Sequence, residues 1–403
     1  MSVKRAIADR PRIFIIAGEE SGDMHGAHLV QELRRLYPDC RLEGLGGDRL
    51  EAAGVRLFHN ITRDLAIIGL MGVVTNFRRI KRVYDFTIAH LEKYRPDALV
   101  LIDYPGFNLR VMKEAHRLGL KVIYYISPQV WAWKRRRIYE IARCVDKMLV
   151  IFPFEVKMYQ ELGVDVHYVG HPLMDHITVN MTRAQVFRKF RFDMDKKLIG
   201  LMPGSRKSEV TRLLPIMVET AERIAEKDPD VQFVLPKAGT VPARVIEKYL
   251  ARGSVDIRVV DKDLYNVRSA LDFAIVKSGT STLETAILET PMIIVYKVNW
   301  LTWLIGKSLV KLHHIGLVNV VAGEGIVPEF LQGEAKPLII AEETLRLLNH
   351  EEELELMRDQ IRRVKEKMGG PGASRNAALQ VLSVLGLKPV VPSASTAGTP
   401  AAR

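Results

Sequence analysis

Short apolar runs alternate with amphipathic stretches along most of the chain. The runs are rich in β-branched and aliphatic residues and are bounded by glycine, proline or charged positions. They are Arg12–Ala17, Ala98–Asp103, Lys121–Ser127, Met148–Phe152, Val166–Gly170, Leu198–Met202, Val231–Leu235, Ile257–Asp261, Phe273–Val276 and Met292–Tyr296. Short apolar strands separated by amphipathic helices are typical of parallel sheets covered by helices. The pattern therefore predicts an α/β fold.

The runs fall into two sets, separated by a polar break at His171–Asp195. We therefore expect two facing Rossmann-like domains, at residues 11–172 and 173–340, with the ligand in the cleft between them. Residues 341–387 should form C-terminal helices: a long one at Glu342–Lys367 and another at Ala373–Leu385. These helices are candidates to pack back on the N-terminal domain. Residues 388–403, rich in Pro, Ser, Thr and Ala, are expected to be a disordered tail.

Composition narrows the class of protein further. The chain has 403 residues, enough for two domains, and its two cysteines form no disulfide framework and no paired-cysteine metal spacing. The start lacks the apolar stretch of a signal peptide, so we expect a cytoplasmic protein. No uninterrupted apolar run reaches membrane-spanning length. The apolar segments 65–74 and 300–310 come closest, and each suits either a core helix or a membrane surface.

A net charge of +12 favours an anionic partner, but it does not choose among nucleic acid, anionic lipid and phosphorylated substrates. The most basic run, Lys134–Arg137, follows the aromatic residues Trp131 and Trp133. Aromatic residues beside basic ones suit stacking and phosphate contact, also in nucleic-acid proteins. The alternative is a solvated surface run without a ligand.

A turn of small residues follows the apolar run Phe273–Val276 and leads into a predicted helix at Leu283–Leu288. The unpaired N–H groups and the dipole of a helix start suit a phosphate. Glu284, one turn in, is placed to accept from ribose hydroxyls. The turn residues are Ser278, Gly279, Thr280, Ser281 and Thr282. The alternative is an ordinary capped helix.

A second turn of this type, Gly204-Ser205-Arg206, follows the run Leu198–Met202. The Arg206 guanidinium is suited to grip a diphosphate with two parallel hydrogen bonds. A surface capping turn is the alternative, but two such turns in one domain favour a sugar-nucleotide site.

The N-terminal domain carries two candidate segments. Glycines at 18, 22 and 26 follow the first run, but their spacing is not the dinucleotide fingerprint, so NAD is not implied. These glycines suit either close approach to a ligand or tight strand-to-helix packing. Asp103 ends the next run, where it is suited to act as general base on a sugar hydroxyl or to cap the following helix.

Together these segments resemble the lipid-A-disaccharide synthase family. The matching pieces run in family order from residue 17 to residue 323. They are AGEESGD (17–23), IDYPGFN (102–108), SPQVWAWKRRR (127–137), PFE (153–155), VGHPLMD (169–175), MPGSRKSEV (202–210), KSGTSTLETAILETPMIIVYK (277–297) and IGLVNVVAG (315–323). One departure is Gly106, where the family commonly has an acidic residue, so Asp103 is the lone carboxylate of its segment.

The resemblance implies a GT-B-type inverting glycosyltransferase of lipid A (lipopolysaccharide) biosynthesis. The donor would be UDP-2,3-diacylglucosamine and the acceptor 2,3-diacylglucosamine 1-phosphate, with the β-1′,6 disaccharide 1-phosphate and UDP as products. It implies no metal and no cofactor. It also implies peripheral association with the inner face of the cytoplasmic membrane of Gram-negative bacteria.

The resemblance also distributes roles over residues of this chain. Asp103 would be the base, and Asn319 a further catalytic residue. Gly204, Ser205, Arg206, the turn 278–282 and Glu284 would hold the UDP moiety. The acceptor side would be lined by Glu19, Ser21, Gly22, Asp23 and Trp131. The basic residues Arg78, Arg79, Lys81 and Arg82 would face anionic lipid headgroups.

Two other readings remain open. The first is another UDP-sugar-dependent enzyme of the same architecture, either a lipid-linked glycosyltransferase or an epimerase. The second is a nucleic-acid-binding protein, which the absence of a recognisable nucleic-acid module disfavours; we expect no nucleic-acid partner.

Overall fold

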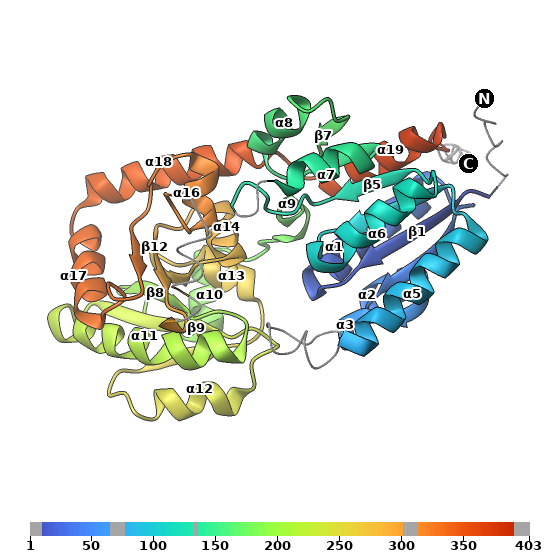
Figure 1. Ribbon diagram of the computed structural model, residues 1–403. Coiled ribbons are helices and arrows are strands. Elements are labelled where there is room, and N and C mark those ends of the chain that lie inside the picture. Colours follow the sequence, from blue (N-terminus) through green and yellow to red (C-terminus); the bar gives the residue numbers. More distant parts are fainter. Residues whose placement is uncertain (1–9, 65–76, 133–135, 301–302, 304–312, 391–403) are drawn as a thin grey trace, which may run out of the picture. The chain divides into compact units, whose positions relative to one another are not determined.

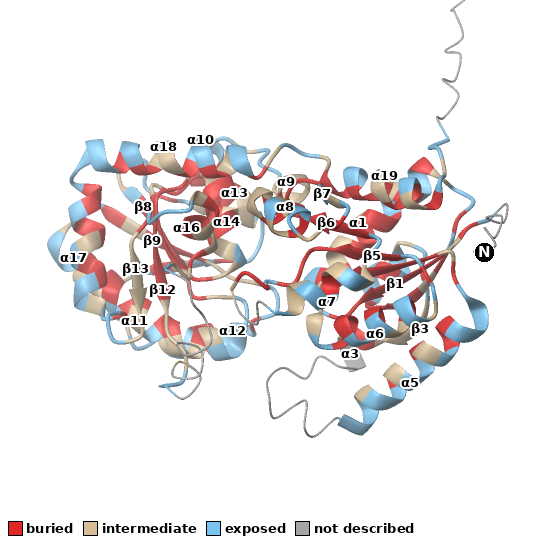
Figure 2. Cartoon of the chain, turned by 45° about the horizontal axis from the view of Figure 1, so that its top comes forward, coloured by how far each residue is buried: buried red, intermediate tan, exposed pale blue. Residues whose placement is uncertain are grey.

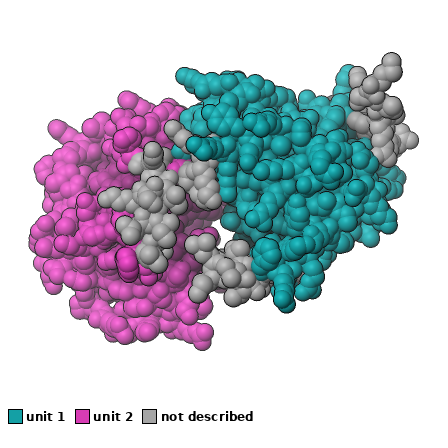
Figure 3. Space-filling model, viewed as in Figure 1, with its two compact units in different colours: residues 1–131, 135–172, 371–403 teal, residues 132–134, 173–370 magenta. Residues whose placement is uncertain are grey.

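The computed structural model describes residues 10–64, 77–132, 136–300, 303 and 313–390 (Figure 1). Segment 65–74 lies outside the described residues, and of segment 300–310 only Trp300 and Trp303 lie within them. The chain divides into two compact units (Figure 3). Unit 1 consists of residues 1–131, 135–172 and 371–403, and unit 2 of residues 132–134 and 173–370.

Unit 1 contains a seven-stranded sheet in the order β3-β2-β1-β4-β5-β6-β7. Every pair of neighbouring strands is parallel. The strands are β1 Arg12–Ala17, β2 Arg41–Gly46, β3 Arg56–Asn60, β4 Ala98–Ile102, β5 Val122–Tyr125, β6 Lys147–Val150 and β7 Val166–Tyr168. The helices are α1 Glu20–Leu36, α2 Asp48–Ala52, α3 Ile61–Asp64, α5 Phe77–Tyr94, α6 Pro105–Arg117, α7 Arg137–Cys144, α8 Pro153–Gln160 and α19 Ala373–Leu385.

Unit 2 contains a six-stranded parallel sheet in the order β10-β9-β8-β11-β12-β13. The strands are β8 Lys197–Met202, β9 Val231–Pro236, β10 Ile257–Val260, β11 Phe273–Lys277, β12 Met292–Tyr296 and β13 Glu329–Leu331. The helices are α9 Leu173–His176, α10 Arg183–Phe190, α11 Lys207–Lys227, α12 Ala243–Leu250, α13 Leu264–Ser269, α14 Thr280–Ile287, α16 Leu317–Ala322, α17 Pro337–Leu348 and α18 Glu351–Lys367.

The core of each unit is its sheet. Figure 2 shows the central strands buried, while the helices bury one face and expose the other. The central strands are apolar on both faces because helices cover them, as in β4, whose five residues are all buried. The predicted α/β fold with two Rossmann-like parallel sheets is confirmed.

Each sheet reverses its strand order at one point. In unit 1 the chain runs from β1 outward to β2 and β3, then crosses to β4 on the other side of β1. In unit 2 it runs from β8 to β9 and β10, then crosses to β11 on the other side of β8. Open parallel sheets bind ligands at the carboxyl ends of the strands that flank such a reversal. The fold therefore predicts ligand sites at the carboxyl ends of β1 and β4 in unit 1, and of β8 and β11 in unit 2.

Two predicted helices have different bounds in the structure. The long helix expected at 342–367 is two helices, α17 and α18, separated at Asn349–His350. The break lets α17 pack on α11 while α18 packs on α14 and α16, which one straight helix would not do. Helix α14 begins at Thr280 rather than Leu283, so Ser281 and Thr282 belong to its first turn.

The last helix of the chain, α19, belongs to unit 1 and has the predicted bounds. It packs against α1. The Asn376 amide donates to the Val169 carbonyl at 3.1 Å, and Lys147 Nζ donates to Gln380 Oε1 at 2.9 Å. The C-terminal helix α19 thus completes unit 1 by packing against residues that lie more than 200 positions earlier in the sequence.

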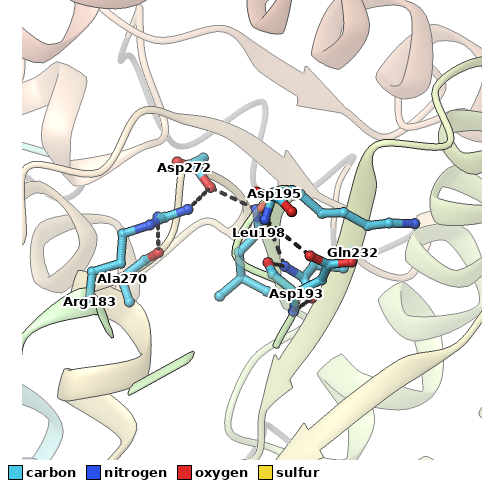
Figure 4. A network of polar contacts seen from close by, with 8 residues as sticks. Arg183, Asp193, Asp195, Leu198, Gln232, Ala270 and Asp272 are labelled. Atoms are coloured by element: carbon cyan, nitrogen blue, oxygen red, sulfur yellow. Dashed lines mark hydrogen bonds and ion pairs between the residues drawn. The ribbon is translucent and has the colours of Figure 1, made fainter. Parts of the chain in front are cut away.

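The amino-terminal edge of the unit 2 sheet is held by a network of polar contacts (Figure 4). Arg183 donates to the Ala270 carbonyl at 2.6 Å and to Asp272 Oδ2 at 2.8 Å. The same Asp272 oxygen accepts from Leu198 N at 2.7 Å, which joins the starts of β8 and β11. These contacts join the amino-terminal ends of β8 and β11, so they stabilise the sheet. The carboxyl ends of the same strands, where a ligand is expected, lie at the opposite edge.

Candidate functional site

The two small-residue turns of unit 2 lie side by side. Strand β8 pairs with β11 in parallel, with Met202 opposite Val276, so the turn at 204–206 and the turn at 278–282 emerge from neighbouring strand ends. These are the ends that flank the strand reversal. The sheet thus brings together two turns that are more than 70 residues apart in sequence.

The turn after β11 offers backbone N–H groups, and two of its hydroxyls, those of Ser278 and Thr282, are already hydrogen-bonded. Gly279 has φ +148°, a region that side chains disfavour, and α14 begins at the next residue. The Ser278 hydroxyl donates to the Ile315 carbonyl at 3.0 Å, and the Thr282 hydroxyl donates to the Gly279 carbonyl at 2.8 Å. Because a helix start leaves its first N–H groups without helical partners, those of Thr280 and Ser281 are suited to meet a phosphate.

The turn after β8 is shaped by Glu209 in the first turn of α11. Its Oε2 accepts from the N–H groups of Ser205 and Arg206, each at 3.2 Å. Gly204 has φ +115°, and a Cβ there would lie 2.4 Å from Glu209 Oε2, so only glycine fits. Glu209 also pairs with Lys277 Nζ at 2.9 Å, which links this turn to the end of β11.

Of the charged side chains that the structure describes where β8 and β11 end, Arg206 is the one with an accessible guanidinium. Burial opposes ionisation of Glu209, but Lys277 and then Arg206 outweigh it, so the pKa of that carboxyl is lowered. The Arg206 guanidinium lies 3.7 Å from Glu209 Oε1, with its side chain 57% exposed. Arg206 is thus placed by the turn, yet accessible to an anionic ligand.

Glu284 is held by Arg268 and Tyr265, and the Ser281 side chain also hydrogen-bonds its carboxylate. Its Oε2 accepts from Arg268 at 2.8 Å and its Oε1 from the Tyr265 hydroxyl at 3.0 Å. Burial would raise the pKa of Glu284, but Arg268, Tyr265 and Ser281 outweigh burial and lower that pKa. A carboxylate has about four acceptor positions, so Glu284 retains capacity for ribose hydroxyls.

Asn319, predicted as a catalytic residue, is fully buried in unit 2. Its amide donates to the Val327 carbonyl at 2.9 Å and to Glu329 Oε1 at 2.7 Å, while its oxygen accepts from the N–H groups of Ile326 and Val327. All its hydrogen-bonding capacity is therefore used internally. This geometry favours a positioning role over direct contact with a substrate.

The network around Asn319 reaches the phosphate-type turn. Glu329 Oε2 accepts from Ile315 N at 2.9 Å, and the Ile315 carbonyl accepts from the Ser278 hydroxyl. Asn319 thus supports the 278–282 turn through Glu329 and Ile315.

In unit 1, Asp103 directly follows β4 at the strand reversal. Burial, and to a smaller extent Glu19, raise the pKa of its carboxyl to about 7, against the opposing hydrogen bond from the Tyr104 N–H. The side chain is half-buried, so it remains within reach of an incoming hydroxyl. A carboxyl with a pKa near neutrality is suited to accept a proton.

The turn after β1 lies beside Asp103, because Ala17 pairs with Ile102. Glu19 and Ser21 are exposed there, and Gly22 packs in α1 without a close clash. A Cβ on Gly18 would lie 2.0 Å from the Tyr104 ring, so glycine at 18 admits the aromatic residue that follows Asp103. The two turns interlock at this edge of the sheet.

Asp23 was predicted to line the acceptor side, and in the structure its carboxylate is engaged in hydrogen bonds within unit 1. Its side chain is buried, and its oxygens accept from Gly47 N at 2.6 Å, Arg49 N at 3.0 Å and Leu50 N at 3.2 Å. These bonds satisfy the N–H groups at the start of α2. Asp23 therefore holds α2 in place, and its oxygens are already engaged.

Trp131, also predicted on the acceptor side, is buried. Its indole N–H donates to Glu155 Oε1 at 3.2 Å, and its ring packs edge-on against Phe154 at 5.4 Å. Burial raises the pKa of Glu155 to about 8, against the hydrogen bonds from Phe152 and Trp131. Trp131 is thus an anchor for its loop rather than an exposed stacking surface. Residues 133–135 lie outside the described part of the chain.

Sequence reasoning missed Glu209, Lys277, Tyr265 and Arg268. Glu209 stands three residues after Arg206 at a helix start, a spacing typical of capping carboxylates, and it could have been found from that signal. Tyr265 and Arg268 are brought to Glu284 by the fold, and no local spacing indicates that contact.

Over the described ranges, no cluster of three or more His, Cys, Asp or Glu residues is placed to hold a metal ion. Over those ranges, too, no helix is both long enough and apolar enough to span a membrane.

The basic residues at 78, 79, 81 and 82 are exposed on α5, which also carries the exposed rings of Phe77 and Phe86.

Known structures share this architecture at low sequence identity. The chain matches the UDP-GlcNAc 2-epimerase of Neisseria meningitidis, solved with UDP-GlcNAc bound, at TM-score 0.60 and 15% identity, over 92% of this chain and 99% of that one. It matches a calicheamicin glycosyltransferase at TM-score 0.60 and 14% identity, over 94% and 99% of the two chains. These likenesses establish the GT-B fold.

Sequence relatives are much closer. A lipid-A-disaccharide synthase of Nitrosococcus oceani is 41% identical over 93% of this chain and 96% of its own length. That of Geobacter metallireducens is 42% identical over 94% and 99%. The family model described as lipid-A-disaccharide synthetase matches residues 13–382. This chain therefore belongs to the lipid-A-disaccharide synthase family, whose members are hexosyltransferases of lipid A biosynthesis.

Proposed function

We propose that this chain transfers 2,3-diacylglucosamine from UDP to the 6-hydroxyl of 2,3-diacylglucosamine 1-phosphate. The products are the β-1′,6-linked disaccharide 1-phosphate and UDP. The observation that carries the proposal is the junction of β8 and β11, where an accessible guanidinium and a helix start emerge from neighbouring strand ends. Family membership supplies the identity of the two sugars.

The donor half of the reaction rests on unit 2. The N–H groups of Thr280 and Ser281 and the Arg206 guanidinium bind the diphosphate, while Glu284 accepts from the ribose hydroxyls. As the bond between the sugar C1 and the phosphate oxygen breaks, negative charge builds on UDP. Fixed donors aimed at that charge lower the barrier. Gly204 and Ser205 shape the turn, Ser278 and Thr282 brace the helix start, and Gly279 leaves its N-terminus open.

The acceptor half rests on unit 1. The Asp103 carboxylate takes the proton of the acceptor 6-hydroxyl as that oxygen bonds to C1 of the donor sugar, and UDP leaves from the opposite face. The attack inverts the configuration at C1. Glu19, Ser21 and Gly22 line the acceptor beside Asp103, and Asn319 supports the 278–282 turn.

The acylated substrates imply a lipid surface. The net charge of +12 and the exposed basic and aromatic residues at the start of α5 suit an anionic membrane. We place the protein in the cytoplasm, peripherally bound at the inner face of the cytoplasmic membrane, and expect the transfer to need no metal or cofactor.

The test is to incubate the purified protein with both acylated sugars and measure UDP release and disaccharide by mass spectrometry. We expect one disaccharide per UDP, in the presence of EDTA as well. A parallel panel offers UDP-GlcNAc without acyl chains, because the fold is shared with epimerases. Epimerised UDP-GlcNAc, or a folded protein that forms no disaccharide, would overturn the proposal.

A substitution at Gly106 tests whether Asp103 is the single carboxylate that acts as base. Gly106 is exposed in the first turn of α6, and no atom lies within 4 Å of a Cβ placed there. An acidic side chain near a helix start is favourable by about 0.3–1 kcal/mol. We therefore expect Gly106→Asp to keep the melting temperature and to keep kcat within about threefold, since the single base is retained. A rise in kcat above tenfold would instead show that a second carboxylate belongs in the reaction.

A further inference from the structure

The backbone at the end of β4 is unusual. Asp103 has φ 44° and Tyr104 has φ 49°, so two consecutive non-glycine residues lie in the left-handed region. Residues other than glycine adopt that region only where the surrounding structure holds them in it. The two residues include the carboxylate that the proposed function uses as base.

Two buried side chains hold this backbone. The Asn108 amide donates to the Asp103 carbonyl at 2.8 Å and to the Ile102 carbonyl at 3.1 Å. The Tyr124 hydroxyl donates to the same Asp103 carbonyl at 2.7 Å. Both side chains are fully buried, one on α6 and one on β5. The Asp103 N–H stays in the sheet and donates to the Tyr125 carbonyl at 3.1 Å.

We propose that Asn108 and Tyr124 are positioning residues for the base: by binding the Asp103 carbonyl, they set the direction in which the Asp103 carboxylate projects. This inference rests on the proposed function for the role of Asp103. The N–H is fixed by β5 and the carbonyl by two donors, so the Cα–Cβ bond between them has one orientation. Neither Asn108 nor Tyr124 contacts a substrate in this account.

The same arrangement controls the surroundings of the carboxyl. Burial and then Glu19, from the turn after β1, raise the pKa of the Asp103 carboxyl, while the Tyr104 N–H opposes the shift. The Asp103 carboxylate in turn raises the pKa of the neighbouring Tyr124 hydroxyl, which burial already raises, so Tyr124 faces the carboxyl as a neutral group. If the backbone relaxes, the carboxyl gains water, and its pKa falls from about 7 towards the ordinary value of an aspartate. A loss of positioning therefore changes both the rate and its pH dependence.

The variant Tyr124→Phe removes one donor and keeps the ring. Thr87→Val is the matched control, because it too removes a buried hydroxyl of unit 1 that donates to a backbone carbonyl, at 2.6 Å from Val83 O. We expect Tyr124→Phe to lower kcat about 10- to 100-fold with KM for the UDP-sugar within about twofold, since small misplacement of a reacting group is costly. The acid limb of the kcat/KM profile should move to lower pH. Thr87→Val should leave both unchanged.

A second measurement does not depend on turnover. The protein is labelled with 13C at the aspartate carboxyl, the Asp103 signal is assigned by its loss in Asp103→Asn, and its titration is followed by NMR. We expect the Asp103 pKa to fall in Tyr124→Phe and in Asn108→Ala, but not in Thr87→Val. A wild-type protein that forms no disaccharide while these shifts appear would overturn the proposed function and support the positioning role. An Asp103 pKa and an acid limb unmoved by Tyr124→Phe would overturn the positioning role.

Discussion

Replacing Asp103 by asparagine is expected to lower kcat ~10²–10⁴-fold, the range that a positioned general base contributes. Asparagine keeps the size of the side chain but cannot accept the proton of the acceptor hydroxyl. The donor is bound by unit 2 in our proposal, so the dissociation constant for UDP should stay within about twofold of the wild-type value. Steady-state kinetics and calorimetry with UDP separate the two effects.

The pH profile gives the same experiment a second readout. The pKa of Asp103 is raised to about 7, mainly by burial, and the base acts only when ionised. Wild-type kcat/KM should therefore rise about tenfold per pH unit below pH 7 and level off above it. In Asp103→Asn this limb should disappear from the residual rate.

The Asp103→Asn substitution should lower activity but not thermal stability at alkaline pH. A carboxyl with a raised folded-state pKa stabilises the fold fully below its unfolded-state pKa, and this contribution is lost as pH rises through about 7. Asparagine does not ionise, so Asp103→Asn should melt at or above the wild-type temperature at pH 8. The control is Asp85→Asn, an exposed carboxylate of unit 1 paired with Lys81 across one turn of α5. Unchanged kcat in a folded Asp103→Asn, or a loss matched by the control, would contradict the base assignment.

The strands that sequence patterning predicted are those with β-branched and aliphatic runs, and β1 and β12 have the predicted bounds. The three that it missed lack such runs. Strand β2 reads Arg-Leu-Glu-Gly-Leu-Gly, and its glycines resemble a turn. A Cβ on Gly44 would lie 1.9 Å from the Ile15 carbonyl, so glycine is required there by close approach of β1. Strands β3 and β13 are sheet edges and remain half-exposed, which weakens their apolar signal.

The positions of the candidate residues in the fold could be predicted where those residues follow strand ends. Asp103, Arg206 and the 278–282 turn follow apolar runs, and parallel strands carry their ends to one edge. The roles of Asp23, Trp131 and Asn319 were not readable in this way, because residue type alone does not tell a ligand contact from a buried hydrogen bond. In the fold these side chains are committed to α2, to Glu155 and to the 326–329 segment.

Replacing Arg206 by alanine is expected to lower kcat/KM ~10²–10³-fold, the size measured when one fixed donor to a developing anion is removed. Arg206 is the exposed guanidinium at the junction of β8 and β11, and its removal leaves the growing charge on UDP with backbone donors alone. The turn should survive, because Glu209 remains paired with Lys277 and still accepts from the N–H groups of Ser205 and residue 206.

Two further variants separate charge from geometry at this position. Arg206→Lys keeps the charge but not the two parallel hydrogen bonds, so it should recover only part of the lost rate. Lys207→Ala removes the neighbouring exposed cation at the start of α11 and should leave kcat/KM within about twofold, since it lies outside the proposed diphosphate contact. Calorimetry with UDP should show weaker binding for Arg206→Ala and not for Lys207→Ala. Equal losses in both variants would mean that general positive charge attracts the donor, because only a specific grip on the diphosphate distinguishes two adjacent cations.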